Sequence, residues 1–170
     1  MTLSKKALSL EVGKSASLAE TVLPENADDK TVTFSTDNKA IATVDASGKV
    51  TGVKAGTVKI TATTSNGLKD ECTVTVTNPV VKVTGVTIAP KTASVEVGST
   101  TSLTATVTPT NATDKTVTFS SSDDELATVD TSGVVTGVKA TEPDTPVIIT
   151  VTTKDGSKTD TCEVTVTAAV

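Results

Sequence analysis

The sequence lacks histidine, arginine, glutamine, tryptophan and tyrosine, and its only aromatic residues are Phe34 and Phe119. Without histidine, neither a Ser-His-Asp nor a Cys-His arrangement for nucleophilic catalysis can be built. Neighbouring carboxylates occur at Asp28–Asp29 and Asp123–Glu125, but adjacent residues in a loop point apart instead of toward one substrate. We therefore expect no catalytic residues, no cofactor-binding residues and no enzymatic activity.

Positive charge is scarce in the second half of the chain. Residues 1–80 carry nine lysines and nine acidic residues, whereas residues 81–170 carry six lysines and eleven acidic residues, and the net charge is −5. Binding to nucleic acid or to an anionic membrane surface depends on basic groups. The composition therefore argues against nucleic-acid and membrane partners.

Cysteine is also sparse, since the chain has only Cys72 and Cys162. Two cysteines do not supply the four ligands of a zinc site. Each alternates with valines along its segment, as in Cys72–Val76, so both are predicted to be small core residues rather than disulfide partners.

Long apolar segments are missing as well. No run approaches the roughly 20 residues of a membrane span, and Met1–Lys6 has no apolar stretch typical of a signal peptide. If Met1 is the native start, we expect the protein to be made in a cytoplasm and to reach its destination without a leader.

What the chain does have is a long internal repeat. Segments 10–13, 30–35, 42–45 and 50–55 return 85 residues later with few changes. A unit of this length can bury its own core, so the repeat predicts two domains, not a solenoid. The expected boundaries are 1–78 for the first domain, 79–84 for a linker and 85–170 for the second domain.

Apolar residues and threonines alternate with a period of two through most of each repeat. The segment Ser102–Val107 is one example. Another is the row of Val58, Ile60 and Ala62, which should face inward, as should the matching residues of the second repeat. This pattern predicts strands that bury one face, about seven in each repeat and no substantial helix. The expected fold is all-β: two tandem β-sandwiches with Greek-key connections in an elongated arrangement.

Turn residues lie between the predicted strands. Asn66-Gly67 and Asp155-Gly156 predict two-residue hairpins, in which both residues take positive φ. Gly13 and Gly98 are expected to allow a bend or a positive φ after the first strand. Pro24 and Pro109 are expected to end the second long strand.

Two departures from exact repetition carry further expectations. The second repeat has an insertion, Thr141–Pro146, where the first has Gly56-Thr57, which should lengthen one loop. The first repeat lacks a counterpart to Val83–Val86, so its first strand should be shorter. Either the resulting terminus is frayed, or an exposed sheet edge is left that could take a strand from a partner.

These motifs resemble the bacterial immunoglobulin-like domain, group 2. The second repeat has the Leu-x-Ala-x-Val-x-Pro pattern at Leu103–Pro109 and a Gly-x-Val-Thr-Gly-Val-x-Ala pattern at Gly133–Ala140. The first repeat keeps Ala55-Gly56 and the closing Cys-x-Val-x-Val at Cys72–Val76. One departure is phenylalanine, at Phe34 and its counterpart, where the family commonly has tryptophan, and both are expected to fill core positions.

The resemblance implies an Ig-like fold in each repeat and a role as a spacer or display module. Such domains occur in bacterial surface adhesins, in S-layer-associated proteins and on tailed-phage virions. Our leading prediction is a phage virion protein on capsid or tail, whose first domain binds the protein lattice while the second projects. The alternative is a spacer from a bacterial cell-surface adhesin.

Three binding hypotheses stay open at this stage. Calcium could be held by oxygens of Asp37, Asn38 and Asp45, or of the matching Asp123, Asp124 and Asp130, although solvated turns explain them better, so no metal site is predicted. Weak contact of host-surface glycans with threonine, asparagine and lysine is conceivable, but strong lectin sites normally use aromatic faces. Asn111–Thr113 matches a glycosylation sequon, but we expect a plain turn at these residues.

Overall fold

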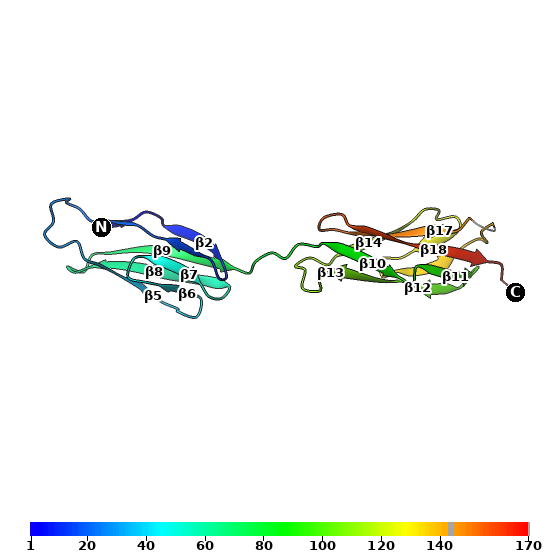
Figure 1. The fold of residues 1–170 in the computed structure, drawn as a ribbon, viewed down its shortest axis with the longest axis horizontal. Coiled ribbons are helices and arrows are strands. Elements are labelled where there is room, and N and C mark those ends of the chain that lie inside the picture. Colours follow the sequence, from blue (N-terminus) through cyan, green and yellow to red (C-terminus); the bar gives the residue numbers. More distant parts are fainter. Residues whose placement is uncertain (143–144, 170) are drawn as a thin grey trace. The chain divides into compact units, whose positions relative to one another are not determined.

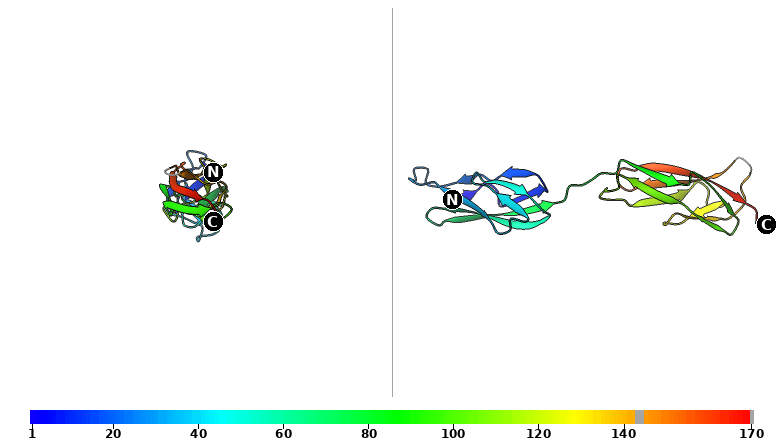
Figure 2. Two further views of the ribbon diagram at one scale, coloured as in Figure 1. Left: turned by 90° about the vertical axis from the view of Figure 1, so that its right-hand side faces the viewer. Right: turned by 60° about the horizontal axis from the view of Figure 1, so that its bottom comes forward.

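The computed structural model describes residues 1–142 and 145–169, and every regular element among them is a β-strand. The chain divides into two compact units, Met1–Pro79 and Val80–Val170. Figure 1 shows the strands of each unit stacked as two facing layers, and the rotated views in Figure 2 agree. The all-β prediction with two sandwiches is confirmed. No helix among the described residues has the length and apolar character needed to cross a membrane.

The first unit is built from nine strands within the described residues. They are β1 (Thr2–Leu3), β2 (Ala7–Glu11), β3 (Ser15–Ser17), β4 (Glu20–Thr21), β5 (Val32–Thr36), β6 (Ala42–Val44), β7 (Lys49–Gly52), β8 (Gly56–Thr64) and β9 (Lys69–Thr77). They form a four-stranded sheet in the order β2-β9-β8-β5, a three-stranded sheet β3-β7-β6 and the short pair β1-β4.

The second unit repeats this plan. Its described strands are β10 (Gly85–Ala89), β11 (Thr92–Glu96), β12 (Thr100–Ser102), β13 (Thr104–Thr108), β14 (Val117–Ser121), β15 (Ala127–Val129), β16 (Val134–Gly137), β17 (Val147–Thr153) and β18 (Thr159–Thr167). The sheets are β11-β18-β17-β14, β12-β16-β15 and the pair β10-β13.

The strand count exceeds the expected seven because the leading segments change partners. In the first unit, β1 pairs antiparallel with β4, and β2 then pairs in parallel with β9 on the other sheet. The next segment is likewise divided, since β3 pairs with β7 before β4 returns to β1. Each predicted long strand is therefore two short ones, and β4 ends at Thr21, before Pro24 is reached.

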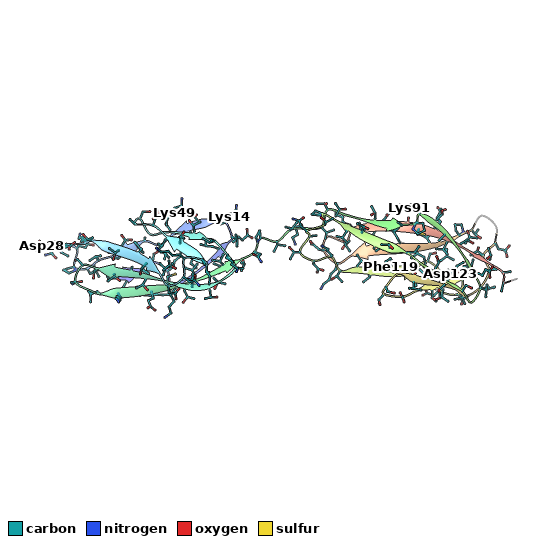
Figure 3. All side chains as sticks on the ribbon, turned by 90° about the horizontal axis from the view of Figure 1, so that it is seen from below. Lys14, Asp28, Lys49, Lys91, Phe119 and Asp123 are labelled. Carbon is teal, nitrogen blue, oxygen red and sulfur yellow. The ribbon has the colours of Figure 1, made fainter. Side chains whose placement is uncertain are left out.

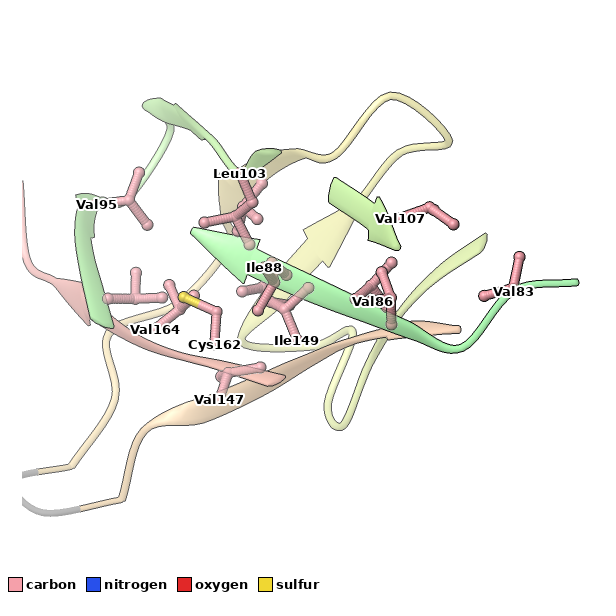
Figure 4. Packing of buried hydrophobic residues seen from close by; sticks show 14 of the residues in the cluster. Val83, Val86, Ile88, Val95, Leu103, Val107, Val147, Ile149, Cys162 and Val164 are labelled. Carbon is pink, nitrogen blue, oxygen red and sulfur yellow. The ribbon is translucent and has the colours of Figure 1, made fainter. Parts of the chain in front are cut away.

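Alternation along the strands places a separate apolar core inside each unit. In β9 every second residue from Cys72 to Val76 is buried, and β18 repeats the pattern from Cys162 to Val166. Figure 4 shows Cys162 among the branched side chains of the second core. The core of the first unit consists of Leu3, Leu8, Leu10, Leu18, Ala42, Val50, Val58, Ile60, Ala62, Cys72, Val74 and Val76.

The closing hairpins differ from the two-residue turns predicted for them. Ser65–Leu68 separates β8 from β9, and Gly67 is the residue there with positive φ, at 84°. The hydroxyl of Thr64 explains the longer loop, because it accepts from the Leu68 N–H (3.0 Å) and donates to Asn66 Oδ1 (2.6 Å). In the second hairpin the Thr153 hydroxyl accepts from the Lys158 N–H (2.9 Å) and donates to the Asp155 backbone carbonyl (2.8 Å). By contrast, the positive φ expected for Gly13 and Gly98 is confirmed, at 82° and 80°.

The insertion of the second repeat is only partly visible. Pro143 and Asp144 lie outside the described residues, so the expected loop is not traced through them. Thr141 ties the start of this segment to β18, since its N–H donates to the Val166 carbonyl at 2.9 Å. The elongated arrangement of the two units stays a prediction.

Candidate functional site

Asp45 and Asp130 occupy the same turn in the two units. One oxygen of Asp45 accepts from the Ser47 N–H (2.9 Å), the Ser47 hydroxyl (2.7 Å) and the Lys49 N–H (3.0 Å). Asp130 makes the matching three bonds within its own turn. The serine hydroxyl, followed by the backbone donor, lowers the pKa of each carboxyl below its usual value. These carboxylates therefore hold the turn between two strands.

Three other side chains of the calcium hypothesis also accept hydrogen bonds from backbone N–H groups. Asp37 accepts from the Lys59 N–H at 3.2 Å, Asn38 from the Ala40 N–H at 3.0 Å, and Asp123 from the Glu125 N–H at 2.9 Å. In the part of the chain that the structure describes, no group of three or more acidic or cysteine side chains is placed to hold a metal ion.

The neighbouring carboxylates Asp28 and Asp29 do not act as a pair. Asp29 accepts from the Thr31 N–H at 2.8 Å. A hydrogen bond from the Ser65 side chain, followed by those from Thr31, lowers the pKa of Asp29 to about 2. In Figure 3, Asp28 lies at the extremity of the loop after β4.

The two cysteines are buried free thiols, as predicted. Both side chains are fully inaccessible to solvent, and burial raises the pKa of each thiol above its usual value. Because the thiolate is the reactive form, neither residue is a nucleophile in the folded protein.

The two phenylalanines pack against the cores of their units, as the sequence predicted, but neither is fully buried. Phe34 and Phe119 are half-buried, because β5 and β14 are the outer strands of their sheets and are covered on one side only. Phe34 lines a crevice of about 340 Å³ between β5 and β6, together with Ser35, Thr36, Lys39, Thr43 and Val44. The crevice combines an aromatic edge with hydroxyls and one lysine.

A second surface feature occurs where the first unit's leading strand is short. Leu23, after β4, is 62% exposed, and Leu68, in the hairpin before β9, is 53% exposed. Val22 is only partly buried, whereas its counterpart Val107 belongs to the second core. The repeat alignment already indicated a shorter strand here, but the exposure of Leu68 has no signal in the sequence.

Both repeats match a known family model. The model for the bacterial Ig-like domain (group 2) matches residues 1–75 and 82–164. The chain belongs to this family. Membership confirms the resemblance drawn from the motifs, and it covers both repeats.

Two relatives resemble this chain to different extents. An Ig-like virion protein of Serratia phage KSP90 is 41% identical over 169 residues, which is 98% of this chain and 64% of that protein. The chain thus spans slightly less than two thirds of this relative. A lacto-N-biosidase of Bifidobacterium bifidum is 48% identical over 71 residues, which is 42% of this chain and 6% of the enzyme.

Solved structures support the fold alone. Drosophila N-cadherin EC1-4 gives a TM-score of 0.54 at 14% identity, over 98% of this chain and 48% of that chain. Protocadherin gamma B2 cadherin domains 3-6 give the same score and identity, over 98% of this chain and 52% of theirs. Bacterial Ig-like units therefore share their sandwich architecture with cadherin domains at low sequence identity.

Proposed function

We propose that the chain is a non-enzymatic structural and display protein of a tailed-phage virion, located on the capsid or tail surface. The observation that carries this proposal is its 41% identity with the phage Ig-like virion protein over 98% of its own length. The chemistry of the described residues is consistent with it. The acidic side chains hold turns, and the thiols are buried.

Within this role, the first unit anchors the protein and the second unit projects. Two observations support the assignment. The excess of acidic residues belongs to the second half, and the exposed leucines Leu23 and Leu68 belong to the first unit. Apolar surface favours association with a protein partner, whereas net charge keeps a projecting unit soluble. Many copies on a repeating lattice would gain avidity from weak individual contacts.

The test is to purify virions of the phage that encodes this sequence and to look for the protein in them. We expect peptides of the chain in the mass spectrum of washed particles and labelling of the particle surface by an antibody against residues 80–169. A particle that lacks the protein would overturn the proposal. A particle labelled by an antibody against the first unit, but not by the other, would reverse the proposed orientation.

A second candidate is a spacer within a bacterial surface or secreted protein. It is favoured by the matching segment in the Bifidobacterium lacto-N-biosidase, where the similarity covers only 6% of the enzyme. The genomic neighbourhood separates the two candidates. Capsid or tail genes beside this sequence favour the virion protein, whereas a parent reading frame with a signal peptide and more repeats favours the spacer.

A further inference from the structure

The crevice between β5 and β6 contains an accessible aromatic side chain, which the sequence did not predict. We call it the Phe34 crevice, and its volume is about 340 Å³. Pockets of roughly 300–1,000 Å³ are typical sites for small molecules. The end of the ring lies against Gly48, since a Cβ on that glycine would lie 2.8 Å from Phe34 Cζ. The ring is therefore fixed by its packing while it lines the crevice.

The backbone of β5 adds donors and acceptors beside the ring. Strand β5 is an outer strand and pairs only with β8. The Asp37 N–H, just after β5, donates to the Lys59 carbonyl at 3.2 Å, and bonded residues alternate along an antiparallel pair. The N–H and carbonyl groups of Phe34 and Thr36 therefore point away from β8. Among the described residues, no strand and no loop is bonded to these groups.

The second unit closes the corresponding space with a side-chain bond. The Ser121 hydroxyl donates to the Ala127 carbonyl at 2.7 Å and so ties β14 to β15. Thr36 stands at the position of Ser121, and its hydroxyl accepts from the Asn38 N–H at 3.3 Å. Within the described residues, the Thr36 hydroxyl makes no bond to β6. In the first unit this hydroxyl is therefore available to a ligand.

The crevice also carries a positive charge that no acidic side chain nearby neutralises. Among the described residues that line it, Lys39 alone is charged. Lys39 is exposed and takes part in none of the ion pairs found in the described parts of the chain. Asp124 stands at the matching position of the second unit. The first unit alone therefore combines the crevice with an ammonium group, which bonds strongly to carboxylates.

We propose that the Phe34 crevice binds an acidic saccharide, through a sugar ring that carries a carboxylate. The C–H face of the sugar packs against Phe34, as apolar surface does against aromatic rings. The carboxylate pairs with Lys39. The sugar hydroxyls bond to the side chains of Thr36 and Thr43 and to the free backbone groups of β5. This binding site goes beyond the display role and does not depend on it.

The first experiment titrates the isotope-labelled full chain with trigalacturonate and, separately, with sialyllactose, while amide resonances are followed by NMR. We expect at least one of these acidic saccharides to give saturable shifts at Phe34, Thr36 and Lys39. The methyl ester of the same saccharide is neutral and should bind about tenfold more weakly, because it cannot pair with the lysine. Acetate should give no saturable shift over the same concentrations.

Three outcomes of this titration would overturn the proposal. One is the absence of saturable shifts at the crevice with both saccharides. Another is equal affinity for the neutral ester, which would show that the carboxylate is not recognised. The third is equal affinity for acetate, which would show that the crevice binds anions without using the sugar ring.

The second experiment changes exposed residues at the crevice. Lys39→Asp introduces the residue of the second unit and should weaken saccharide binding about tenfold or more. Thr43→Val removes a hydroxyl from β6 and should weaken it about threefold. The matched control Lys14→Asp makes the same charge change after β2, at the far edge of the sheet from β5, and should bind like the parent chain. Unchanged affinity in Lys39→Asp, or an equal loss in Lys14→Asp, would contradict the assignment of the site.

Discussion

At the scale of single residues, glycine and aspartate do most to define the turns. Gly48 and Gly133 have φ of 75° and 86°, and a side chain on either would be driven into backbone. The aspartates Asp45 and Asp130 supply the acceptors that these turns require. Because both kinds of residue recur at matching positions, the repeat preserves the turn chemistry as well as the strands.

Gly48→Ala should destabilise the first unit by roughly 1–3 kcal/mol. A Cβ at this position would lie 2.4 Å from the Leu18 carbonyl and 2.8 Å from the ring of Phe34, in addition to the strain of a positive φ. The control is Gly67→Ala, where φ is 84° and the space is open, so only the strain remains. Urea denaturation of both variants checks this. A loss for Gly67→Ala that equals the loss for Gly48→Ala would refute the steric argument.

Asp70 predicts how stability depends on acidity. Its carboxylate pairs with Lys6 and accepts from the Leu3 N–H at 2.7 Å, and these bonds lower its pKa from 3.8 to about 2. When the pKa of a carboxyl is lower in the folded state than in the unfolded chain, the carboxyl stabilises the folded state at pH values above its unfolded-chain pKa. This contribution is lost as the pH falls through the pKa of the folded state. We expect the melting temperature of the first unit to fall between pH 4 and pH 2.

The variant Asp70→Asn should flatten this decline, because the titrating group is gone, and should lower the melting temperature at pH 7. The control Glu11→Gln removes an exposed carboxylate of β2 and should leave the pH profile in place. A decline of full steepness in Asp70→Asn would show that other groups govern the acid sensitivity.

At the scale of elements, side-chain hydroxyls decide how the closing hairpins are built. Thr64 and Thr153 end β8 and β17, and both are buried polar residues. Each hydroxyl spans its loop and satisfies the N–H that follows the turn. The Asn-Gly and Asp-Gly dipeptides indicated turns at the right places, but the predicted two-residue turn type was wrong. The dipeptide rule does not consider a threonine at the end of the preceding strand.

Thr153→Val should destabilise the second unit by about 1–2 kcal/mol, because the Lys158 N–H loses its acceptor while the volume of the side chain is kept. The control is Thr161→Val, an exposed position on β18 that should be nearly neutral. Thermal unfolding followed by circular dichroism measures both. Equal stability of Thr153→Val and the parent would mean that water replaces the hydroxyl.

At the scale of the whole molecule, the chain carries two apolar cores of the same design. Val50 and Val135 occupy matching places in them, and both side chains are inaccessible to solvent. Each core is made from one repeat, so stability should reside in each unit separately. The order of sheets is also duplicated without change.

Val50→Ala should lower the melting temperature of the first unit by roughly 10 °C, since deleting two buried methyl groups costs about 2 kcal/mol. The transition of the second unit should stay in place, and Val135→Ala should give the reverse result. Differential scanning calorimetry, with resonances of each unit assigned by NMR, separates the two transitions. A single transition shifted alike by both variants would show that the units unfold together.

The sequence by itself determined the duplication, the all-β class and the identity of the buried face, because a period of two and a constant offset are local, readable properties. It also placed both cysteines in the cores. Tertiary structure decided what depends on neighbours across space: the switch of the leading strands between sheets, the half-burial of Phe34 on an outer strand, and the exposure of Leu23 and Leu68. Exposure at such sites is set by which strand lies alongside, and no local pattern records that.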